Sequence, residues 1–259
     1  MKQNTTNLKK RIQSGETVYG TWINMGSLVS AEIVGQAGFD WVLIDLEHGV
    51  ANDNIMFGQL QILSGLPVTS LVRIDEISRP KVQRIMDAGA EGIMFPHVHN
   101  SAEAAEAVGM MYYPPVGSRG MAKIVRATGF GTNANNYIDQ LQENLVGIVQ
   151  IETLEALKDV DKIAAAPNVD VLFVGPSDLS LALGVFGQLD HPLYQQAIKD
   201  VAAAAKKYNK ATGVLMLNVS EHDMYHQLGY RFLACGGDVT FVVKGAAEMV
   251  KQLNGHRST

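Results

Sequence analysis

The sequence predicts an α/β fold, a (β/α)8 TIM barrel, from three observations. Short strands alternate strictly with helix patterns, and eight such units fit into 259 residues. The strands are almost continuously apolar, which is typical of an all-parallel sheet buried on both faces. Chains of this length commonly form one barrel, so we expect a single domain over residues 1–259. An open doubly wound sheet is the competing fold, but no G-x-G-x-x-G follows the first strand.

Each predicted strand is a short apolar run bounded by turn residues, and a segment with helical periodicity follows it. The strands are expected at Val18–Asn24, Asp40–Asp45, Val68–Arg73, Gly92–Phe95, Leu145–Ile151, Val169–Val174, Ala211–Leu217 and Phe232–Ala234. The helices are expected at Ser30–Ala37, Asp53–Leu63, Arg79–Ala88, Ser101–Met110, Leu154–Ala165, Leu193–Tyr208, Glu221–Leu228 and Asp238–Leu253, with a short helix and turn in Leu179–His191. A Gly-, Pro- and Asn-rich excursion, Tyr112–Asn136, exceeds the minimal unit, and such segments are uncommon unless functional or disordered.

The composition predicts a soluble cytoplasmic enzyme-like protein. Hydrophobic residues make up 47% and charged residues 18% of the chain, and the net charge of −5 with no large basic cluster argues against nucleic-acid binding. Cys235 is alone, which rules out an internal disulfide framework and suits a reducing compartment. The polar start, Met1–Asn7, is no signal core, and no apolar run reaches the roughly 18 residues that a membrane helix needs.

Polar residues collect where the predicted strands end. In a βα barrel the active site is built from these C-terminal ends and the loops that follow them. The residues found there are Asn24, Asp45, Glu47, His48, Arg73, Pro96, His97, Gln150, Glu152, Ser177, Asp178, Asn218 and Cys235-Gly-Gly-Asp238. The opposite ends carry mainly Gly, Ala, Pro and Asn turn residues. The sequence therefore predicts a polar site at the C-terminal end of the barrel.

Two acids suggest a divalent metal site. Gln150 and Glu152 close the fifth strand with the same parity, and Asp178 follows the sixth strand. A carboxylate at the end of a buried strand is costly without a cation or proton partner. Neighbouring strands lie about 4.8 Å apart, so both acids could reach one ion, and an oxygen-rich set suits Mg²⁺ or Mn²⁺. The alternative for either acid is a first-turn or capping role in the following helix.

His48 and Arg73 are the candidate base and the candidate oxyanion-stabilising group. A single His is more often a hydrogen-bonded structural residue, but a nearby carboxylate would raise the basicity of His48, and Asp45 and Asp87 are candidates. Arg73 beside a metal would stabilise developing negative charge, although it could also pair with Asp75 or Glu76 at the surface.

The remaining strand-end residues give weaker indications. His97 and His99 are more typical of loop residues than of ligands. Gly236-Gly237 is as consistent with a plain turn as with an anion-binding turn, which a non-catalytic binding protein would use. No strand carries a Lys at an inner C-terminal position, so Schiff-base chemistry is disfavoured.

In combination these motifs resemble the HpcH/HpaI family of class II, metal-dependent pyruvate aldolases. The similarity runs from about Gly15 to the last helix. The stretches that carry it are Gly20-Thr-Trp22, Ala37-Gly-Phe-Asp-Trp-Val-Leu-Ile-Asp45-Leu-Glu-His48, Val72-Arg73, Asp87-Ala-Gly-Ala, Pro114-Pro-Val-Gly-Ser-Arg-Gly120, Gln150-Ile-Glu152 and Val174-Gly-Pro-Ser-Asp178-Leu.

The resemblance implies a role for each matching position. Glu152 and Asp178 would hold Mg²⁺ or Mn²⁺, with Co²⁺ as an alternative ion. His48 would be the general base, Asp87 the acid that raises its basicity, and Arg73 the residue that stabilises enolate charge. The 2-oxo acid would be bound by Gln150, by Gly175, Pro176, Ser177 and Asp178, and by Leu217 in the acceptor pocket.

The implied reaction is cleavage or formation of a 4-hydroxy-2-oxo acid from pyruvate and an aldehyde through a metal-bound enolate. Family members that use oxaloacetate, by decarboxylation or by citrate-synthase-like bond formation, share these motifs and remain the alternative. The resemblance also implies a trimer-based homo-hexamer in which the C-terminal helix packs against a neighbouring subunit.

Overall fold

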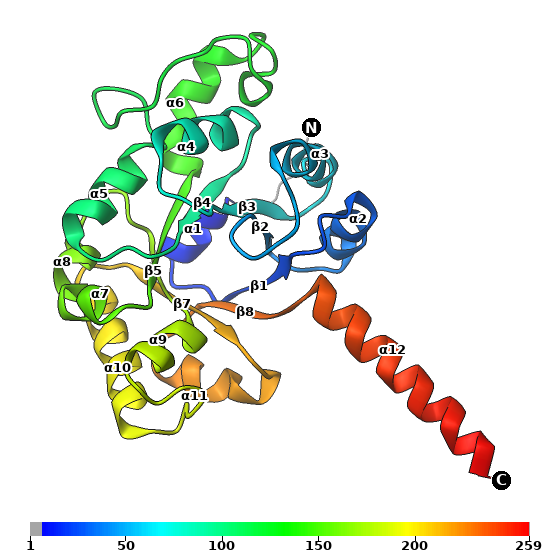
Figure 1. The fold of residues 1–259 in the computed structure, drawn as a ribbon. Helices are drawn as coiled ribbons and strands as arrows, with labels where there is room; N and C mark the ends of the chain where they lie inside the picture. The colour runs from blue at the N-terminus through cyan, green and yellow to red at the C-terminus, as the bar shows by residue number, and fades with distance from the viewer. Residues whose placement is uncertain (1–6, 259) are drawn as a thin grey trace.

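The eight strands form one closed parallel barrel in chain order. Figure 1 shows the arrangement of helices around this barrel in the computed structural model, which describes residues 7–258. The strands are β1 (Val18–Ile23), β2 (Trp41–Asp45), β3 (Thr69–Arg73), β4 (Gly92–Phe95), β5 (Val146–Ile151), β6 (Val171–Val174), β7 (Ala211–Met216) and β8 (Phe232–Gly237). Each lies within a few residues of its predicted position, so the (β/α)8 prediction is confirmed. Of the polar start Met1–Asn7, residues 1–6 lie outside the described part of the chain.

Alternation along each strand separates two cores. Side chains of one parity meet inside the barrel, where Trp22, Leu43, Leu71, Ile148 and Phe173 belong to one apolar cluster. Side chains of the other parity pack outward against the helices and form a second, larger cluster. The inward parity continues to the strand ends, where the apolar layer gives way to polar side chains. This change of chemistry places the site at the C-terminal end of the barrel.

Nine helices line the outside of the barrel within residues 7–258 and follow the strands as predicted, with one correction. They are α2 (Leu28–Gln36), α3 (Asp53–Leu63), α4 (Arg79–Asp87), α5 (Ser101–Gly109), α7 (Leu154–Lys158), α8 (Val160–Ala165), α9 (Pro176–Ala182), α10 (Pro192–Lys207) and α11 (His222–Gln227), the last preceded by the short turn η2 (Val219–Glu221). The single helix predicted over Leu154–Ala165 is wrong, because the segment breaks at Asp159. The Asp159 carboxylate accepts the Ser101 backbone N–H at 2.8 Å and so ties the break to α5.

Two further helices, α1 and α6, were not predicted from the sequence. The helix α1 (Leu8–Gln13) covers the N-terminal ends of the strands, and its Leu8 and Ile12 join the interior cluster. Its buried Lys9 reaches the Asp170 carboxylate at 3.2 Å and the Leu145 carbonyl at 3.0 Å. The long excursion contains the turn η1 (Arg126–Thr128) and then α6 (Ala134–Asn144), so it is ordered structure and not an open loop.

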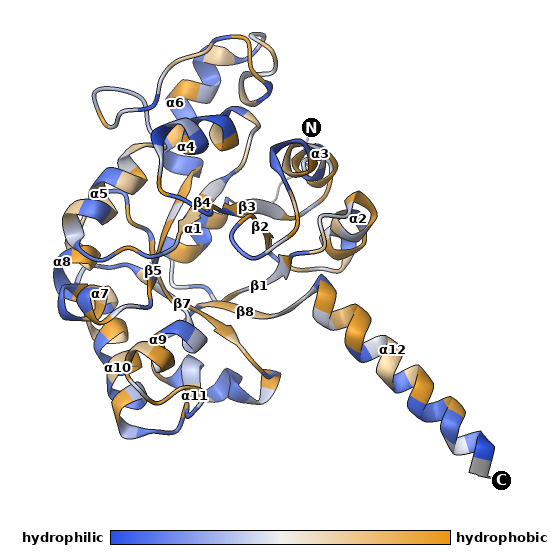
Figure 2. Ribbon diagram, viewed as in Figure 1, coloured by the Kyte–Doolittle hydropathy of each residue, from blue (hydrophilic) through white to orange (hydrophobic). Residues whose placement is uncertain are grey.

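The last helix, α12 (Asp238–Gly255), extends away from the barrel and is followed by the turn η3 (His256–Ser258). Its first residue is anchored, since Asp238 accepts the Asn24 backbone N–H at 2.8 Å and the Ser30 hydroxyl at 2.6 Å. Beyond that turn, apolar side chains stay exposed along the helix, as its orange segments in Figure 2 show: Val239, Val242, Val243, Met249, Val250 and Leu253. No helix among residues 7–258 is both long enough and apolar enough to cross a membrane.

Candidate functional site

A two-point ion pair between Asp45 and Arg73 forms the floor of the site. The two residues end β2 and β3 as register partners, so inward parity brings them face to face. The Arg73 Nε and Nη2 atoms lie 2.9 and 2.8 Å from the two Asp45 carboxylate oxygens. The remaining Arg73 Nη1 lies 3.0 Å from Glu47 Oε2. Burial alone would lower the pKa of Arg73, but Asp45, Glu47 and Glu152 outweigh it and raise the pKa, so the guanidinium stays charged.

Asp45 also shapes the loop that follows β2. One of its oxygens accepts the Asn24 side-chain amide at 2.6 Å, and the other accepts the backbone N–H groups of Glu47 at 3.1 Å and His48 at 3.4 Å. A short acid that accepts backbone N–H groups two and three residues ahead fixes a turn. The alternative for Arg73, a surface pairing with Asp75 or Glu76, is not adopted, because Arg73 is buried against Asp45.

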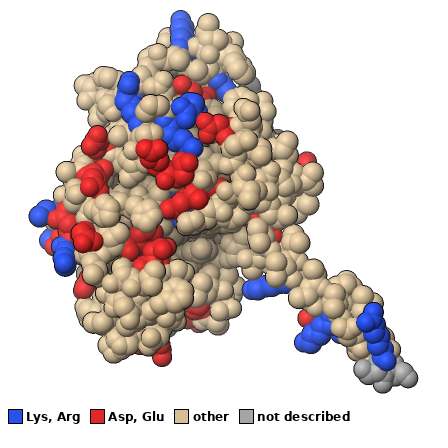
Figure 3. Space-filling view, in the orientation of Figure 1, with Lys and Arg blue, Asp and Glu red and all other residues tan. Residues whose placement is uncertain are grey.

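Glu152 is a buried carboxylate at the end of β5. Its Oε1 accepts the His97 backbone N–H at 2.7 Å, and its Oε2 accepts the Gln150 side-chain amide at 2.7 Å. Burial raises the pKa of Glu152; the His97 N–H and ring oppose this, and the negative charges of Asp178 and Glu47 add to it. Asp and Glu side chains gather near the middle of the face shown in Figure 3. Burial and the neighbouring negative charges therefore disfavour the anionic form of Glu152, which a cation would stabilise.

Asp178 lies in the first turn of α9, the position that the alternative interpretation of this acid expects, and it is exposed to solvent. Its negative charge adds to the rise in the pKa of Glu152, so the two carboxylates repel each other electrostatically. The turn Gly175–Ser177 passes directly over Glu152, because a Cβ added at Gly175 would lie 2.8 Å from Glu152 Oε2. Gly175 therefore allows the backbone of this turn to approach the carboxylate.

The donor set at this point suits a hard divalent cation. Glu152 and Asp178 would supply oxygens to such a cation, and the buried Oε1 of Gln150 has no hydrogen-bond partner among the described residues. Over residues 7–258, no three His, Cys, Asp or Glu side chains come together as a ready-made metal cage. A two-carboxylate site that leaves positions for water and substrate is the arrangement that fits both observations.

His48 lies at the rim of the site, and the predicted pairing with Asp87 is not made within the chain. The His48 ring is largely exposed, and its Nε2 lies 3.9 Å from Glu47 Oε2. Asp87 ends α4, a helix that runs back toward the N-terminal ends of the strands, and its Oδ1 accepts from the buried Arg119 at 2.6 Å. Asp87 therefore secures the segment around Arg119, and Glu47 is the carboxylate beside His48.

Of the other predicted residues, Ser177 lies in the first turn of α9, and Leu217 directly follows β7; both are exposed. Leu217 follows β7, and its backbone N–H donates to Glu221 at 3.2 Å. Gly236 adopts a φ of 70°, and the buried Asp238 carboxylate behind it already binds the backbone of the first loop. A negative charge there opposes anion binding, which favours the plain-turn interpretation of Gly236-Gly237.

The sequence analysis marked His97 and Glu47 only as polar residues at strand ends, although both contact the predicted site residues. The His97 Nε2 lies 3.3 Å from Glu47 Oε1, and its Nδ1 lies 3.8 Å from Glu152 Oε1. Their positions could have pointed to the site, because His97 follows Pro96 at the end of one strand and Glu47 precedes the candidate base His48. The backbone conformation that points the His97 N–H toward Glu152 could not be predicted from residue types.

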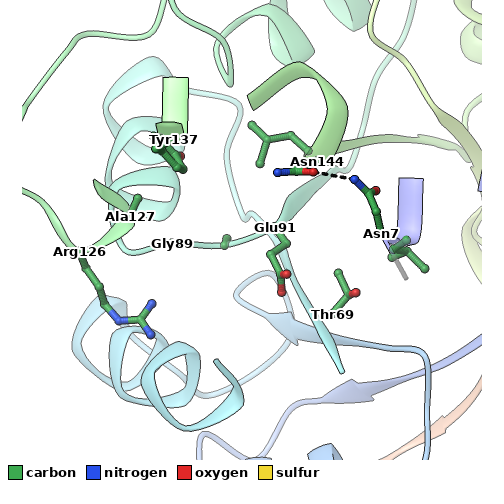
Figure 4. A pocket seen from close by; sticks show the side chains of 11 residues that line it. Asn7, Thr69, Gly89, Glu91, Arg126, Ala127, Tyr137 and Asn144 are labelled. Atoms are coloured by element: carbon green, nitrogen blue, oxygen red, sulfur yellow. Dashed lines mark hydrogen bonds between the residues drawn. The ribbon is translucent and has the colours of Figure 1, made fainter. Parts of the chain in front are cut away.

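A separate cavity of about 550 Å³ lies at the other end of the barrel, where α1, η1 and α6 meet the strands (Figure 4). Asn7 donates to Asn144 at its edge at 2.6 Å. The Arg126 guanidinium beside it donates to the carbonyls of Ala88 at 2.6 Å and Leu60 at 3.2 Å, so it binds the C-terminal ends of α4 and α3. These contacts are those of a structural junction, remote from the polar strand ends.

The sequence matches the family model of HpcH/HpaI aldolase/citrate lyase over residues 19–245. It is 35% identical over 255 residues to a hydroxypyruvate/pyruvate aldolase of Paraburkholderia phytofirmans, covering 96% of this chain and 98% of that one. It is also 35% identical over 251 residues to a 4-hydroxy-2-oxo-heptane-1,7-dioate aldolase of Klebsiella pneumoniae, covering 97% and 95% of the two chains.

Solved structures give the same result. A crystal structure of an HpcH/HpaI aldolase/citrate lyase family protein from Burkholderia cenocepacia superimposes with a TM-score of 0.91 at 34% identity. The superposition covers 96% of this chain and 100% of that chain. Because the family model spans most of the sequence, and the relatives are matched over nearly their full length, the chain belongs to the HpcH/HpaI aldolase/citrate lyase family.

Proposed function

We propose that this protein is a divalent-metal-dependent aldolase, an aldehyde-lyase that cleaves or forms 4-hydroxy-2-oxo acids from pyruvate and an aldehyde. The observation that carries the proposal is the buried, acid-surrounded Glu152 beside a charged Arg73 at the polar end of the barrel. The relatives named as aldolases of hydroxypyruvate, pyruvate and a 4-hydroxy-2-oxo dicarboxylic acid support the substrate class.

Glu152 and Asp178 would hold the ion, and Mg²⁺ or Mn²⁺ fits their oxygens best, with Co²⁺ as the alternative. Bound there, a divalent cation supplies a Lewis acid that polarises the keto group of a 2-oxo acid. Gln150, with its free Oε1, and the turn Gly175, Pro176 and Ser177 would hold the substrate carboxylate and keto group beside it.

In the cleavage direction, His48 removes the proton from the 4-hydroxyl group of the substrate. The C3–C4 bond then breaks, the aldehyde leaves, and the electron pair passes into the enolate of the pyruvate portion. Arg73 stabilises the negative charge that develops on the enolate oxygen, held in position by Asp45. A proton returned to C3 gives pyruvate, and the same steps in reverse make the new bond. The exposed Leu217 is proposed to line the pocket for the aldehyde.

Two experiments test this function. Purified protein is treated with EDTA and then resupplied with Mg²⁺ or Mn²⁺; activity that is lost and recovered supports the proposal, and full activity without metal contradicts it. The protein is then incubated with pyruvate plus a panel of aldehydes, and separately with oxaloacetate alone. New 4-hydroxy-2-oxo acids identify the aldolase, whereas turnover of oxaloacetate alone would favour the decarboxylating or citrate-synthase-like alternative.

We also propose a trimer-based homo-hexamer in which α12 packs against a neighbouring subunit. The exposed apolar residues Val239, Val242, Val243, Val250 and Leu253 recur at helical spacing, which marks one face of the helix. A stripe of this kind on a helix that leaves its own barrel is typical of an interface. Asp87 could reach a His48 ring only from such a neighbour, since within the chain it binds Arg119.

A further inference from the structure

His97 has an unusual backbone conformation at the edge of the proposed metal site. It follows Phe95 and Pro96 at the end of β4, and its φ is +51°. The left-handed region is disfavoured for residues that carry a Cβ, and such residues cluster where surrounding contacts hold them in place. Only three other residues of this kind occur among the described non-glycine residues: Phe130, Asn168 and Asn209.

This conformation turns the His97 N–H onto Glu152, which ends the neighbouring strand. The bond from His97 N to Glu152 Oε1 is 2.7 Å long, and the bond from Gln150 Nε2 to Glu152 Oε2 has the same length. Each carboxylate oxygen can accept about two hydrogen bonds or metal bonds. One donor on each oxygen therefore fixes the plane of the carboxylate and leaves a free lone pair on both oxygens for a cation.

The imidazole of His97 makes a second, different contact, since its Nδ1 lies 3.8 Å from Glu152 Oε1, beyond hydrogen-bonding distance. Its Nε2 lies 3.3 Å from Glu47 Oε1, while Oε2 of the same Glu47 lies 3.0 Å from Arg73 Nη1. The ring itself is mostly exposed, so it is not a packing element of the core. Through Glu47, the side chain of His97 therefore helps hold the guanidinium that faces the developing charge.

We propose that His97 is a positioning residue with two separable parts. Its left-handed backbone sets the affinity for the divalent cation by orienting Glu152, and its imidazole sets the rate of enolisation by holding Glu47 and, through it, Arg73. This inference rests on the proposed function, because it assigns the roles of one residue within that same site. Hydrogen-bonding partners of metal ligands commonly change metal affinity about 10–100-fold when they are removed.

Substitutions at His97 can separate the two parts. His97→Gly keeps the backbone conformation and the N–H but removes the ring, and His97→Asn keeps the conformation and a short polar side chain. His97→Ala and His97→Val also lack the ring, and their Cβ groups increasingly disfavour a positive φ. His99 supplies the matched control, because it lies in the same loop but its N–H donates to Glu103. His99→Gly and His99→Val are therefore made in parallel.

Two quantities are measured on each variant after its fold has been checked by circular dichroism. The first is the Kd for Mn²⁺ of the metal-free protein, from the electron paramagnetic resonance signal of free Mn²⁺. The second is the rate of deuterium exchange into the methyl group of pyruvate at saturating Mn²⁺, by nuclear magnetic resonance. We expect the Kd to rise about tenfold or more in His97→Val, less in His97→Ala and little in His97→Gly.

Exchange should be slowed in His97→Gly although Mn²⁺ binding is kept, and His97→Asn should recover part of the rate. The His99 variants should match the wild type in both measurements. Wild-type affinity in both His97→Ala and His97→Val, or equal loss in His97→Gly and His97→Val, would overturn the backbone role. If the wild-type protein itself bound no Mn²⁺, the proposed function would fail together with this inference. Normal wild-type binding with unaffected variants would remove the inference alone.

Discussion

Arg73 and Asp45 form a two-point ion pair at the end of adjacent strands, with Nε–Oδ1 and Nη2–Oδ2 distances of 2.9 and 2.8 Å. A guanidinium fork matched to a carboxylate fixes both the position and the orientation of the charge. The third nitrogen of Arg73, Nη1, contacts Glu47, so all three nitrogens of the guanidinium have a carboxylate partner and the orientation of the group is restrained. Under the proposed function, the pair would present a charge of fixed geometry to the substrate.

Arg73→Lys should keep the charge but lose this geometry. Lys offers a point charge that cannot bond both oxygens of Asp45 in the plane of the strand ends. We expect deuterium exchange into pyruvate to slow roughly 100-fold, the usual effect of losing one oxyanion-stabilising donor. The Kd for Mn²⁺, measured on the same samples, should change little, because Lys keeps the positive charge that acts on Glu152, and the ion pairs of Arg73 are with Asp45 and Glu47. An exchange rate near that of the wild type would remove Arg73 from the mechanism.

Glu152→Gln should change the pH dependence of stability in the metal-free protein. Burial raises the pKa of Glu152 above its unfolded value, so the folded state holds the proton to higher pH than the unfolded state does. Stability must then fall as pH rises through the interval between the two pKa values. The free energy of unfolding of the wild type should equal that of Glu152→Gln at pH values below the pKa of Glu152 in the unfolded state. Above the pKa of Glu152 in the folded state, the wild type should be the less stable of the two.

Urea denaturation across that pH range, in EDTA, measures the difference. The exposed Glu155, in the first turn of α7, gives the matched control Glu155→Gln, whose stability should run parallel to the wild type. Added Mn²⁺ should reverse the order at high pH, since it stabilises only a chain that still carries the carboxylate. A constant difference between wild type and Glu152→Gln at every pH would contradict the raised pKa.

The barrel could be predicted from the sequence because its signal is local. The apolar composition of strands such as Trp41–Asp45 and Val171–Val174 is enough to predict that they are buried, and helices with periodic patterns follow them. The helices α1 and α6 were missed for the opposite reason. The helix α1 has only six residues and is held by tertiary contacts such as Lys9 with Asp170, which no local pattern reveals. The helix α6 is polar and lies inside the Asn- and Gly-rich excursion, where the composition is typical of a loop.

For the site, the sequence identified the polar residues but not all of their partners. Parity along β5 was enough to predict that Gln150 and Glu152 face one side, and they are bonded to each other. The pairing of His48 with Asp87 failed within the chain, because helix α4 carries Asp87 to the other end of the barrel. The contact of His97 with Glu152 depends on a backbone angle, which residue types alone do not determine.

Charges on the exposed face of α12 should prevent assembly. The double variant Val242→Glu and Val250→Glu places two carboxylates on the apolar stripe, where burial against a neighbour would desolvate them. Analytical ultracentrifugation should show a hexamer for the wild type and smaller species for the variant. Glu248→Lys, which alters the charge of an exposed polar position of the same helix, should leave the assembly intact. A double variant that still sedimented as a hexamer would exclude this face from the interface.

Asp87→Asn should lower the stability of the folded protein, because Asp87 has a structural partner within the chain. Asp87 is the carboxylate that pairs with the buried Arg119, at 2.6 Å, and Arg119 also donates to the Tyr137 hydroxyl at 2.8 Å. Removing one partner of such a pair leaves a charge that is poorly solvated, which costs about 3 kcal/mol of unfolding free energy. Urea denaturation should report this loss, and the exposed Asp139→Asn on α6 should show none. A variant with wild-type stability and lost aldol activity would instead assign Asp87 to the chemistry, delivered to His48 from a neighbouring subunit.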